Sequence, residues 1–246
     1  MTQRVALVTG GTGGIGTEIC KALADQGHKV VASWLAGIDD GEGWVAKMKA
    51  EGYEFEIAEG NVANFDAATA MVKEAESKVG PIDILVNCAG ITRDSTLRKM
   101  QYEQWDAVIR SNLDSVFNVT KQVIGGMIER KFGRVINISS VNGQKGQFGQ
   151  VNYSASKAGM HGFTMSLAQE VARKGVTVNT ISPGYIATQM MNTLKEDVLN
   201  GIIAQIPVGR LGKPDEIAWV VGFLTDERSA FITGANIAIN GGLHMG

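Results

Sequence analysis

The chain has 246 residues, a formal net charge of −2 and 44% hydrophobic residues, enough apolar material for one sizeable core. A near-neutral charge without basic blocks argues against a nucleic-acid-binding surface. The two cysteines have no metal-like spacing, the three histidines are scattered, and no apolar run approaches the ~18 residues of a membrane span. We therefore expect a cytoplasmic protein with no metal site and no nucleic-acid or membrane partner.

Short apolar runs alternate with longer helical patterns along the whole chain. The runs of strand length are residues 4–8, 30–33, 55–58, 82–86, 135–138, 176–181 and 236–239. The helical patterns run from Gly14 to near Gly27 and over residues 41–51, 65–79, 102–131, 151–174 and 213–224. Strands that are apolar on both faces and separated by helices predict a parallel sheet covered on both sides. We predict an α/β protein with a single Rossmann-fold domain over residues 1–246 and a doubly wound, seven-stranded parallel sheet.

Residues 185–212 interrupt this alternation. A strand should recur there, but the sequence has a helical insertion that carries methionines. Ligands bind at the carboxyl ends of the strands in such sheets, so we predict that this segment is a lid over the substrate.

A glycine-rich turn follows the first predicted strand and opens a helix. Gly10 permits the tight turn, whereas Gly14 and Gly16 let the backbone and helix approach a diphosphate closely. A turn without a ligand is the alternative, but a strand, turn and helix in this order favour a dinucleotide at the helix N-terminus. The predicted cradle consists of Gly10, Thr12, Gly13, Gly14, Ile15 and Gly16.

Two further strand ends are candidates for the cofactor site. Asn87, Ala89 and Gly90 end the fourth strand, where small residues would let a ribose lie against the backbone. Asn61 and Val62 end the third strand and are predicted to contact the adenine. Asn and Gly also simply end strands, so each signal alone is weak.

The choice of cofactor depends on the exit of the second strand, near Trp34. A ribose 2′-phosphate requires Arg or Lys there, whereas a free 2′-hydroxyl is held by an acid. No cation lies between Lys29 and Lys47, while Asp39 and Asp40 do. We therefore predict a preference for NADH, with NADPH possible. The alternative for the two aspartates is that they cap the following helix.

Tyr153 and Lys157 are four residues apart, which places them on one face of a helix. Ser140 ends the fifth strand, so all three are predicted at the carboxyl edge of the sheet. An ammonium beside the phenol should lower the pKa of Tyr153 from ~10. Tyr153 would then protonate the oxygen of a carbonyl that receives hydride, while Ser140 donates a hydrogen bond to it.

Two further roles complete this constellation. Lys157 can also hold the nicotinamide ribose, and Asn112 could anchor a water that resupplies the proton through Lys157. A Tyr–Lys pair at this spacing is common on helices, and serine often ends strands. Four such positions after a nucleotide-binding turn predict redox chemistry on a carbonyl or an alcohol.

The motifs together resemble the short-chain dehydrogenase/reductases over essentially the whole chain. They are the glycine turn, Asn87-x-Ala89-Gly90, Asn112, Ser140, Tyr153-x-x-x-Lys157 and Pro183-Gly184. The resemblance implies a catalytic tetrad of Asn112, Ser140, Tyr153 and Lys157, and usually a homotetramer. It also implies that the nicotinamide end of the cofactor contacts Pro183, Gly184, Ile186 and Thr188. Cys88 departs from the asparagine that the family commonly has there.

The segments around the predicted pocket resemble those of family members that reduce acetoacetyl-CoA in polyhydroxyalkanoate synthesis. The resemblance implies a short 3-oxoacyl thioester as substrate and its (R)-3-hydroxy form as product. Phe148 and Tyr185 would exclude long acyl chains, and Asp94 and Lys99 lie on the rim where the pantetheine arm would pass. The predicted substrate residues are Asp94, Lys99, Ser140, Gln147, Phe148, Gln150 and Tyr185. These relatives mostly use NADPH, but the local electrostatics favours NADH here.

Two alternatives and an assembly follow from the same residues. A 3-oxoacyl-[acyl-carrier-protein] reductase needs a basic entrance, for which the candidates are Arg130, Lys131, Arg173 and Lys174. A non-catalytic dinucleotide sensor would tend to lose Tyr153 or Lys157, and both are present. For the homotetramer, helices 102–131 and 151–174 would form one interface, and residues 217–224 with the last strand would form a second.

Overall fold

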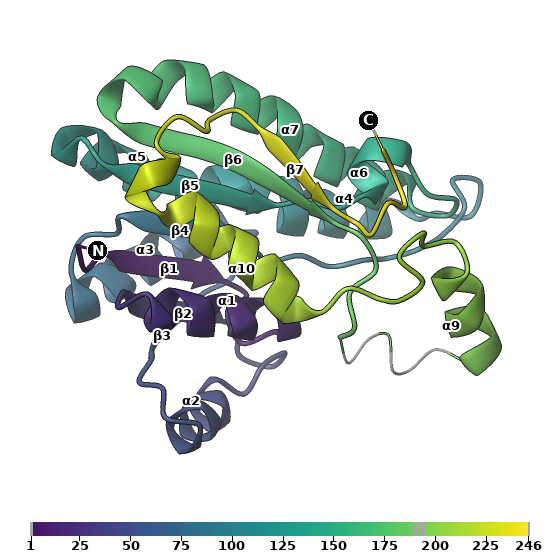
Figure 1. The fold of residues 1–246 in the computed structure, drawn as a ribbon, viewed down its shortest axis with the longest axis horizontal. Helices are drawn as coiled ribbons and strands as arrows, with labels where there is room; N and C mark the ends of the chain where they lie inside the picture. The colour runs from purple at the N-terminus through teal and green to yellow at the C-terminus, as the bar shows by residue number, and fades with distance from the viewer. Residues whose placement is uncertain (1, 189–190, 192–194, 246) are drawn as a thin grey trace.

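Seven parallel strands form one sheet in the order β3-β2-β1-β4-β5-β6-β7 (Figure 1). The computed structural model describes residues 2–188, 191 and 195–245. The strands are β1 (Val5–Thr9), β2 (Lys29–Trp34), β3 (Glu56–Glu59), β4 (Ile84–Asn87), β5 (Gly133–Ile138), β6 (Val176–Pro183) and β7 (Asn236–Ile239). The predicted doubly wound Rossmann fold is confirmed. The strand order reverses between β1 and β4, which makes this edge of the sheet the place for a ligand.

The sheet is buried on both faces because its central strands carry apolar side chains in both directions. Ala6 and Val8 pack in a core with α1 (Gly14–Asp25), α2 (Gly41–Ala50) and α10 (Pro214–Thr225). Leu7 between them packs in the opposite core with α3 (Phe65–Val79), α5 (Ser115–Arg130) and α7 (Val151–Val171). This alternation is the period of two that a strand imposes.

The predicted helix over residues 102–131 is divided by a π-helical turn. The helix α4 (Tyr102–Ile109) leads into the turn η1 (Arg110–Asp114), and α5 follows directly. A π turn carries one residue more than an α turn and often marks a functional position. Asn112 lies at its centre, where it is fully buried.

Three other departures are smaller. The predicted helix over residues 151–174 continues after α7 as a 3₁₀ turn, Ala172–Lys174. Two short helical segments were not predicted: α6 (Asn142–Lys145), between β5 and α7, and the 3₁₀ turn Glu227–Ser229. No helix among the described residues is both long and apolar enough to cross a membrane.

The segment 185–212 leaves the sheet and returns to the same place. Ala187 N donates to Gly212 O (2.8 Å), and Gly212 N donates to Tyr185 O (2.9 Å), so the two ends of the segment are paired. Its helix α9 (Glu196–Ile203) has no buried residue. Figure 1 shows α9 beyond the carboxyl ends of the strands. Residues 189–190 and 192–194 of the predicted lid lie outside the described residues.

Candidate active site

The glycine turn between β1 and α1 depends on close backbone contacts. Gly10 has φ +61°, and a Cβ there would lie 3.0 Å from Cα of Ala89. A Cβ on Gly16 would overlap the carbonyl oxygen of Gly10. The helix α1 has Gly13 as its N-cap residue, with no side-chain cap and no acid in its first turn, and the buried Oγ1 of Thr12 has no partner among the described residues. Free N–H groups and an unpaired hydroxyl beside a glycine turn fit the diphosphate of a dinucleotide.

The end of β4 lies beside this turn and beside Lys157, the predicted catalytic lysine. The hydroxyl of Thr9 accepts hydrogen bonds from the backbone N–H groups of Cys88 (3.0 Å) and Ala89 (3.1 Å). A Cβ on Gly90 would lie 3.4 Å from Nζ of Lys157. The sequence therefore brings the predicted ribose position and the predicted catalytic ammonium together, and the cysteine at position 88 leaves the turn intact.

Other predicted cofactor residues have structural partners. The side chain of Asn87 is buried, and its Nδ2 donates to Oγ1 of Thr120 (3.1 Å) and to Oδ1 of Asn137 (2.8 Å), so both amide hydrogens are used within the protein. Asn61 accepts a hydrogen bond from a backbone N–H two residues on, and the carbonyl of Val62 accepts from Asn118 (2.9 Å). Contacts of Asn61 and Val62 with adenine stay a prediction.

The carboxylates after β2 both bind the backbone of their own loop. Asp39 accepts from Leu35 N (3.1 Å), and Asp40 caps α2 by accepting from Gly43 N (2.9 Å). The ring of Trp34 packs against the first residue of α2. The capping alternative therefore describes Asp40, and a contact of either acid with the ribose stays a prediction.

The segment predicted to contact the nicotinamide follows β6 and lies against the start of α1. Gly184 N donates to Ile239 O (2.8 Å), which ties the end of Pro183 to β7. The Cγ2 of Thr188 lies 3.4 Å from the position of a Cβ on Gly14. Ile186 is buried in the core below. Thr188 thus lies against the start of α1, where the resemblance to the family places the cofactor.

Ser140 has a fixed hydrogen-bonding role at the end of β5. Its Oγ accepts from the backbone N–H of Asn142 (3.1 Å), the first residue of α6. This bond does not use the hydroxyl proton, which can be donated to another acceptor such as the oxygen of Tyr153. The turn packs against α7, because a Cβ on Gly143 would lie 2.9 Å from the backbone of Lys157.

Lys157 is buried and oriented by the sheet. Its Nζ donates to the carbonyl of Ile138 (2.7 Å) and lies 5.6 Å from the ring centroid of Tyr153. Burial penalises the ammonium and lowers the pKa of Lys157 to about 8. The side chain still carries its charge at neutral pH.

The pKa of Tyr153 is shifted in the direction opposite to the prediction. Burial raises it above its ordinary value, and Asp94 and Cys88 raise it further. A hydrogen bond with Ser140 lowers it, but burial has the larger effect. The prediction of a lowered pKa was wrong for this structure, because desolvation penalises a phenolate more than the nearby groups favour it. A protonated phenol is the form that donates a proton to a reduced carbonyl.

The side chain of Asn112 holds the π turn to the neighbouring elements. Oδ1 accepts from Ile91 N (2.8 Å), and Nδ2 donates to Ile91 O (3.0 Å) and to Oγ of Ser156 (3.2 Å). Both amide hydrogens are used. A water anchored by Asn112 that resupplies the proton through Lys157 stays a prediction.

The predicted substrate residues fall into two groups. Gln150 and Asp94 are bonded to one another, with Gln150 Nε2 donating to Asp94 Oδ2 (2.8 Å). Tyr185 is half-buried, and burial followed by Asp94 raises its pKa. Phe148 is 87% exposed, so it makes no closed wall, and contacts of this outer group with an acyl chain stay a prediction.

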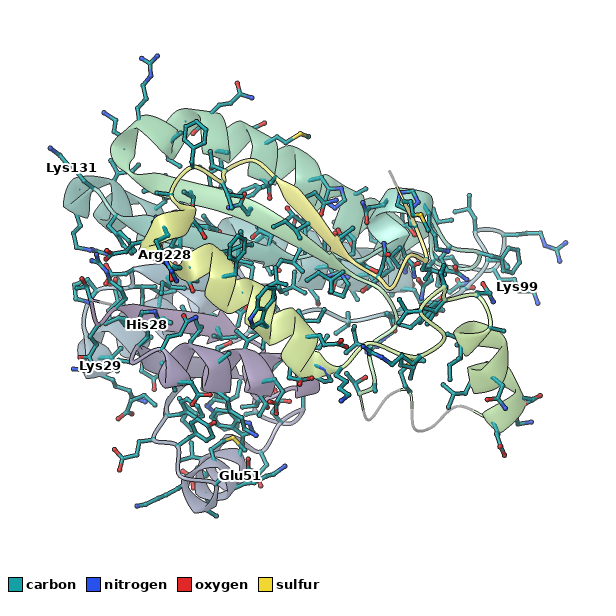
Figure 2. The ribbon with its side chains drawn as sticks, in the orientation of Figure 1. His28, Lys29, Glu51, Lys99, Lys131 and Arg228 are labelled. Atoms are coloured by element: carbon teal, nitrogen blue, oxygen red, sulfur yellow. The ribbon has the colours of Figure 1, made fainter. Side chains whose placement is uncertain are left out.

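The remaining rim residues point outward. Gln147 Oε1 accepts from Lys145 Nζ (3.3 Å) on the surface. Figure 2 shows Lys99 at the end of the molecule where α9 also lies, extended away from the core. Lys131 lies at the opposite end in the same view. The predicted basic patch that includes Lys131 is thus remote from the entrance.

Sequence reasoning missed several buried polar residues that support the site. Asn152 donates through Nδ2 to Arg93 O (3.0 Å) and Gln104 O (3.1 Å), while its Oδ1 accepts from Tyr153 N (2.8 Å). Asn142 donates to Gln150 in addition to supporting Ser140. Their position next to Tyr153 and Ser140 was the available signal, but asparagine in such places is also common in turns.

The comparisons with known proteins agree with this geometry. Residues 4–199 match the family model described as short chain dehydrogenase. The chain belongs to the short-chain dehydrogenase family.

Several relatives match over their full length. Acetoacetyl-CoA reductase of Cupriavidus necator is 59% identical over 246 residues, which cover 100% of each chain. Acetoacetyl-CoA reductase of Allochromatium vinosum is 58% identical over 243 residues, or 98% of this chain and 99% of the relative. A 3-oxoacyl-[acyl-carrier-protein] reductase of Staphylococcus epidermidis is 41% identical over 243 residues, or 99% of this chain and 100% of the relative.

Proposed function

We propose that this protein is an oxidoreductase that uses a nicotinamide dinucleotide to reduce acetoacetyl-CoA to (R)-3-hydroxybutanoyl-CoA in polyhydroxybutyrate synthesis. One observation carries the proposal. Ser140, Tyr153 and Lys157 meet beside a dinucleotide-type glycine turn, in a chain that is 59% identical to an acetoacetyl-CoA reductase over its full length. The test is steady-state reduction of acetoacetyl-CoA by the purified protein, and no turnover with either reduced dinucleotide would refute it.

The residues of the chain divide the chemistry between them. The bound dinucleotide supplies a hydride to the carbonyl carbon. Ser140 accepts from Asn142 N and is hydrogen-bonded to Tyr153, and its hydroxyl proton would turn to the carbonyl oxygen of the bound substrate. Tyr153, protonated at neutral pH, transfers its proton to that oxygen as negative charge develops.

Lys157 supports the tyrosine after the proton has left. Its ammonium lies on the same side of α7 as the phenol and retains its charge below a pKa of about 8. A phenolate next to this cation is favoured over one in an apolar pocket. Reprotonation through a water held by the π turn around Asn112 would complete the cycle.

We infer that NADH is the preferred cofactor. The support is the absence of Lys and Arg between Lys29 and Lys47 together with Asp39 and Asp40 at the exit of β2. Two carboxylates repel a 2′-phosphate. The test is kcat/KM with acetoacetyl-CoA for NADH and NADPH in parallel, and a larger value with NADPH would refute the preference.

The carrier-protein alternative finds less support. Arg130, one of its four basic residues, pairs with Asp83 (3.1 Å) just before β4, at the edge opposite the catalytic residues. Lys131 and Gly175 are in backbone contact, so Arg173 and Lys174 lie at this same far edge. Rates with acetoacetyl-CoA and with the carrier-bound thioester would separate the two substrates.

We propose that four copies assemble through two separate apolar faces. Phe65 of α3 and Phe117 of α5 stack at 6.2 Å, and both are exposed. On α10, Trp219 stacks with Phe223 at 6.3 Å and is 71% exposed. Two different faces, each able to meet its own copy, give a tetramer with two kinds of interface. Trp219→Glu should reduce the mass measured by light scattering to that of a dimer, and an unchanged tetramer would contradict this assignment.

We also infer that residues 185–212 act as a lid. The paired ends at Tyr185 and Gly212 provide a base, and α9 between them is exposed. Limited proteolysis within α9 should slow when dinucleotide and acetoacetyl-CoA are both present. Equal cleavage with and without ligands would contradict the lid.

A cytoplasmic location is proposed from the two cysteines. Cys20 and Cys88 are unpaired, as expected of a protein kept in a reducing compartment. Fractionation of the source cells with an activity assay would test the location.

A further inference from the structure

We propose that Asn142 is a positioning residue that, with Gln150, links the charge of Asp94 to the hydrogen-bond donor Ser140. This inference rests on the proposed function and concerns how the substrate end of the site is held. Asp94 and Gln150 were predicted as direct substrate contacts, whereas Asn142 was not predicted at all.

The three side chains form a continuous hydrogen-bonded chain across three segments. Gln150 Nε2 donates to Asp94 Oδ2 (2.8 Å), and Asn142 Nδ2 donates to Gln150 Oε1 (2.9 Å). Asp94 lies in the segment after β4, Asn142 lies in α6, and Gln150 directly precedes α7. Backbone pairing supports the same junction, since Ser95 N donates to Gly149 O (2.8 Å).

The direction of this chain follows from the carboxylate at its end. An ionised carboxylate only accepts, so Gln150 must turn its Nε2 towards Asp94. The Oε1 of Gln150 then faces Asn142, which must donate to it through Nδ2. Asn142 is 7% exposed, and its buried Oδ1 has no partner among the described residues. An unpaired buried acceptor is unfavourable. The orientation of the Asn142 amide is therefore imposed by its hydrogen bond to Gln150 and not by its other surroundings.

The backbone of Asn142 connects these hydrogen bonds to the proposed reacting groups. Its N–H donates to Oγ of Ser140 (3.1 Å), which leaves the Ser140 proton for the substrate oxygen. The next residue, Gly143, packs against the backbone of Lys157. The short helix α6 is therefore held between Ser140 and Lys157 by the polar chain on one side and α7 on the other.

Exchanging the donor at position 142 and the acceptor at position 94 tests the hydrogen-bonded chain directly. In Asn142→Asp, Gln150 faces a carboxylate at both ends and can donate its amide to only one of them. The KM for acetoacetyl-CoA should rise about tenfold, the effect of one lost hydrogen bond. In Asp94→Asn, the amide can still pair with Gln150, so the rise should stay within about threefold.

The double variant Asp94→Asn/Asn142→Asp should recover. Gln150 would donate to the new carboxylate at 142 and accept from the new amide at 94, so that the chain runs backwards with the same net charge. We expect KM within about threefold of wild type. Additive effects, with the double variant as poor as Asn142→Asp, would overturn the proposal.

Two controls separate positioning from general damage. Gln144→Ala removes an amide from the same short helix whose buried Oε1 has no described partner. It should leave the KM for acetoacetyl-CoA unchanged, and an equal rise there would overturn the proposal. The KM for NADH should be unchanged in every variant, because the chain lies on the substrate side.

A second variant covers a failure to fold. If thermal unfolding shows that Asn142→Asp is not folded, Asn142→Ala should give a similar rise in KM without a new charge. A folded Asn142→Ala with wild-type KM would overturn the proposal. Failure of the wild-type protein to reduce acetoacetyl-CoA would refute the proposed function, whereas lack of rescue in an active background refutes only the polar chain.

Discussion

The predicted dinucleotide half and the predicted catalytic half of this sheet edge differ in what stabilises them. On the dinucleotide side, backbone atoms come so close that a side chain at Gly10 or Gly16 would meet other backbone. On the other side, buried polar side chains form specific hydrogen bonds, with Asn112 donating to Ser156 of α7 and Lys157 donating to the carbonyl of Ile138 at the end of β5. The first half therefore depends on glycines that have no Cβ atom. The second half depends on hydrogen bonds between buried donors and acceptors.

The polar construction extends below the catalytic residues. Asn137 of β5 accepts from Asn87 of β4 (2.8 Å) and donates to Thr164 of α7 (2.8 Å), whose hydroxyl lies 2.7 Å from that of Thr180 of β6. These buried groups satisfy one another and join three strands to the helix that carries Tyr153. Such a network is costly to interrupt, because each loss leaves an unpaired buried group. Substitutions in the two halves should therefore fail in different ways.

The largest expected effect is on chemistry alone. Tyr153→Phe removes the proposed proton donor but leaves the ring, so kcat should fall by about 10²–10⁴-fold. The dissociation constant for the dinucleotide, measured by fluorescence titration, should change less than about twofold, because the glycine turn is untouched. Unchanged turnover would contradict the assignment of Tyr153.

A steric change should damage the other half. In Gly16→Ala, the new Cβ would overlap Gly10 O and lie 2.8 Å from Cα of Gly11, and neither backbone atom can move aside easily. We expect a loss of about 1–3 kcal/mol in the free energy of unfolding and weaker dinucleotide binding. Denaturant unfolding and binding titration measure the two effects.

The matched control for this change is Gly125→Ala in α5. A Cβ there meets nothing within 4 Å. It should be neutral or stabilise by up to ~1 kcal/mol, since alanine favours a helix. Equal damage from both substitutions would contradict the steric explanation.

Lys157 allows activity and stability to be separated. Lys157→Met should abolish reduction, yet stabilise the ligand-free protein at pH 7 by about 1–2 kcal/mol, because a buried ammonium is removed. The folded pKa is lowered to about 8 by burial, so the unfolded chain binds more protons between there and its ordinary value of ~10.4. The free energy of unfolding of the wild type therefore rises with pH over this window. The extra stability of Lys157→Met relative to the wild type should shrink accordingly. Urea unfolding of both proteins at pH 7 and pH 9.5 measures this difference in stability. The same difference at both pH values would contradict a buried charge at Lys157.

The smallest expected effect links α2 to the glycine turn. Trp44 Nε1 donates to Thr17 Oγ1 (2.9 Å), which in turn donates to Gly11 O (3.4 Å). Trp44→Phe keeps the stack on Phe55, whose ring centroid is 5.2 Å away, but removes this hydrogen bond. The KM for the dinucleotide should rise about twofold to fivefold, with kcat unchanged. A changed kcat would show that the two halves are not separable here.

Local patterns in the sequence were sufficient for the architecture. Apolar runs bounded by turns predicted all seven strands, because burial on both faces favours consecutive apolar residues, such as Ile84, Leu85 and Val86 of β4. The glycine turn and the Tyr153–Lys157 spacing were also readable, since each is a short motif whose geometry follows from one strand end or one helix face. These features involve residues close together in the chain.

Other features were decided only when distant segments packed together. The π turn at Asn112 depends on partners at Ile91 and Ser156, and no periodicity in residues 102–131 reveals them. The raised pKa of Tyr153 depends on how deeply the phenol is buried, a quantity that spacing from Lys157 does not contain. The partners of Gln150 were likewise invisible in sequence.

The sequence by itself determined the doubly wound sheet and the glycine turn between β1 and α1, and it supplied the candidates for the reacting groups. The tertiary structure decided which polar atoms are hydrogen-bonded within the protein and which are not. It also decided the direction of the pKa shifts of Tyr153 and Lys157. The physical reason is range: backbone propensity and apolar periodicity act over a few residues, whereas desolvation and hydrogen-bond pairing depend on neighbours that only folding brings together.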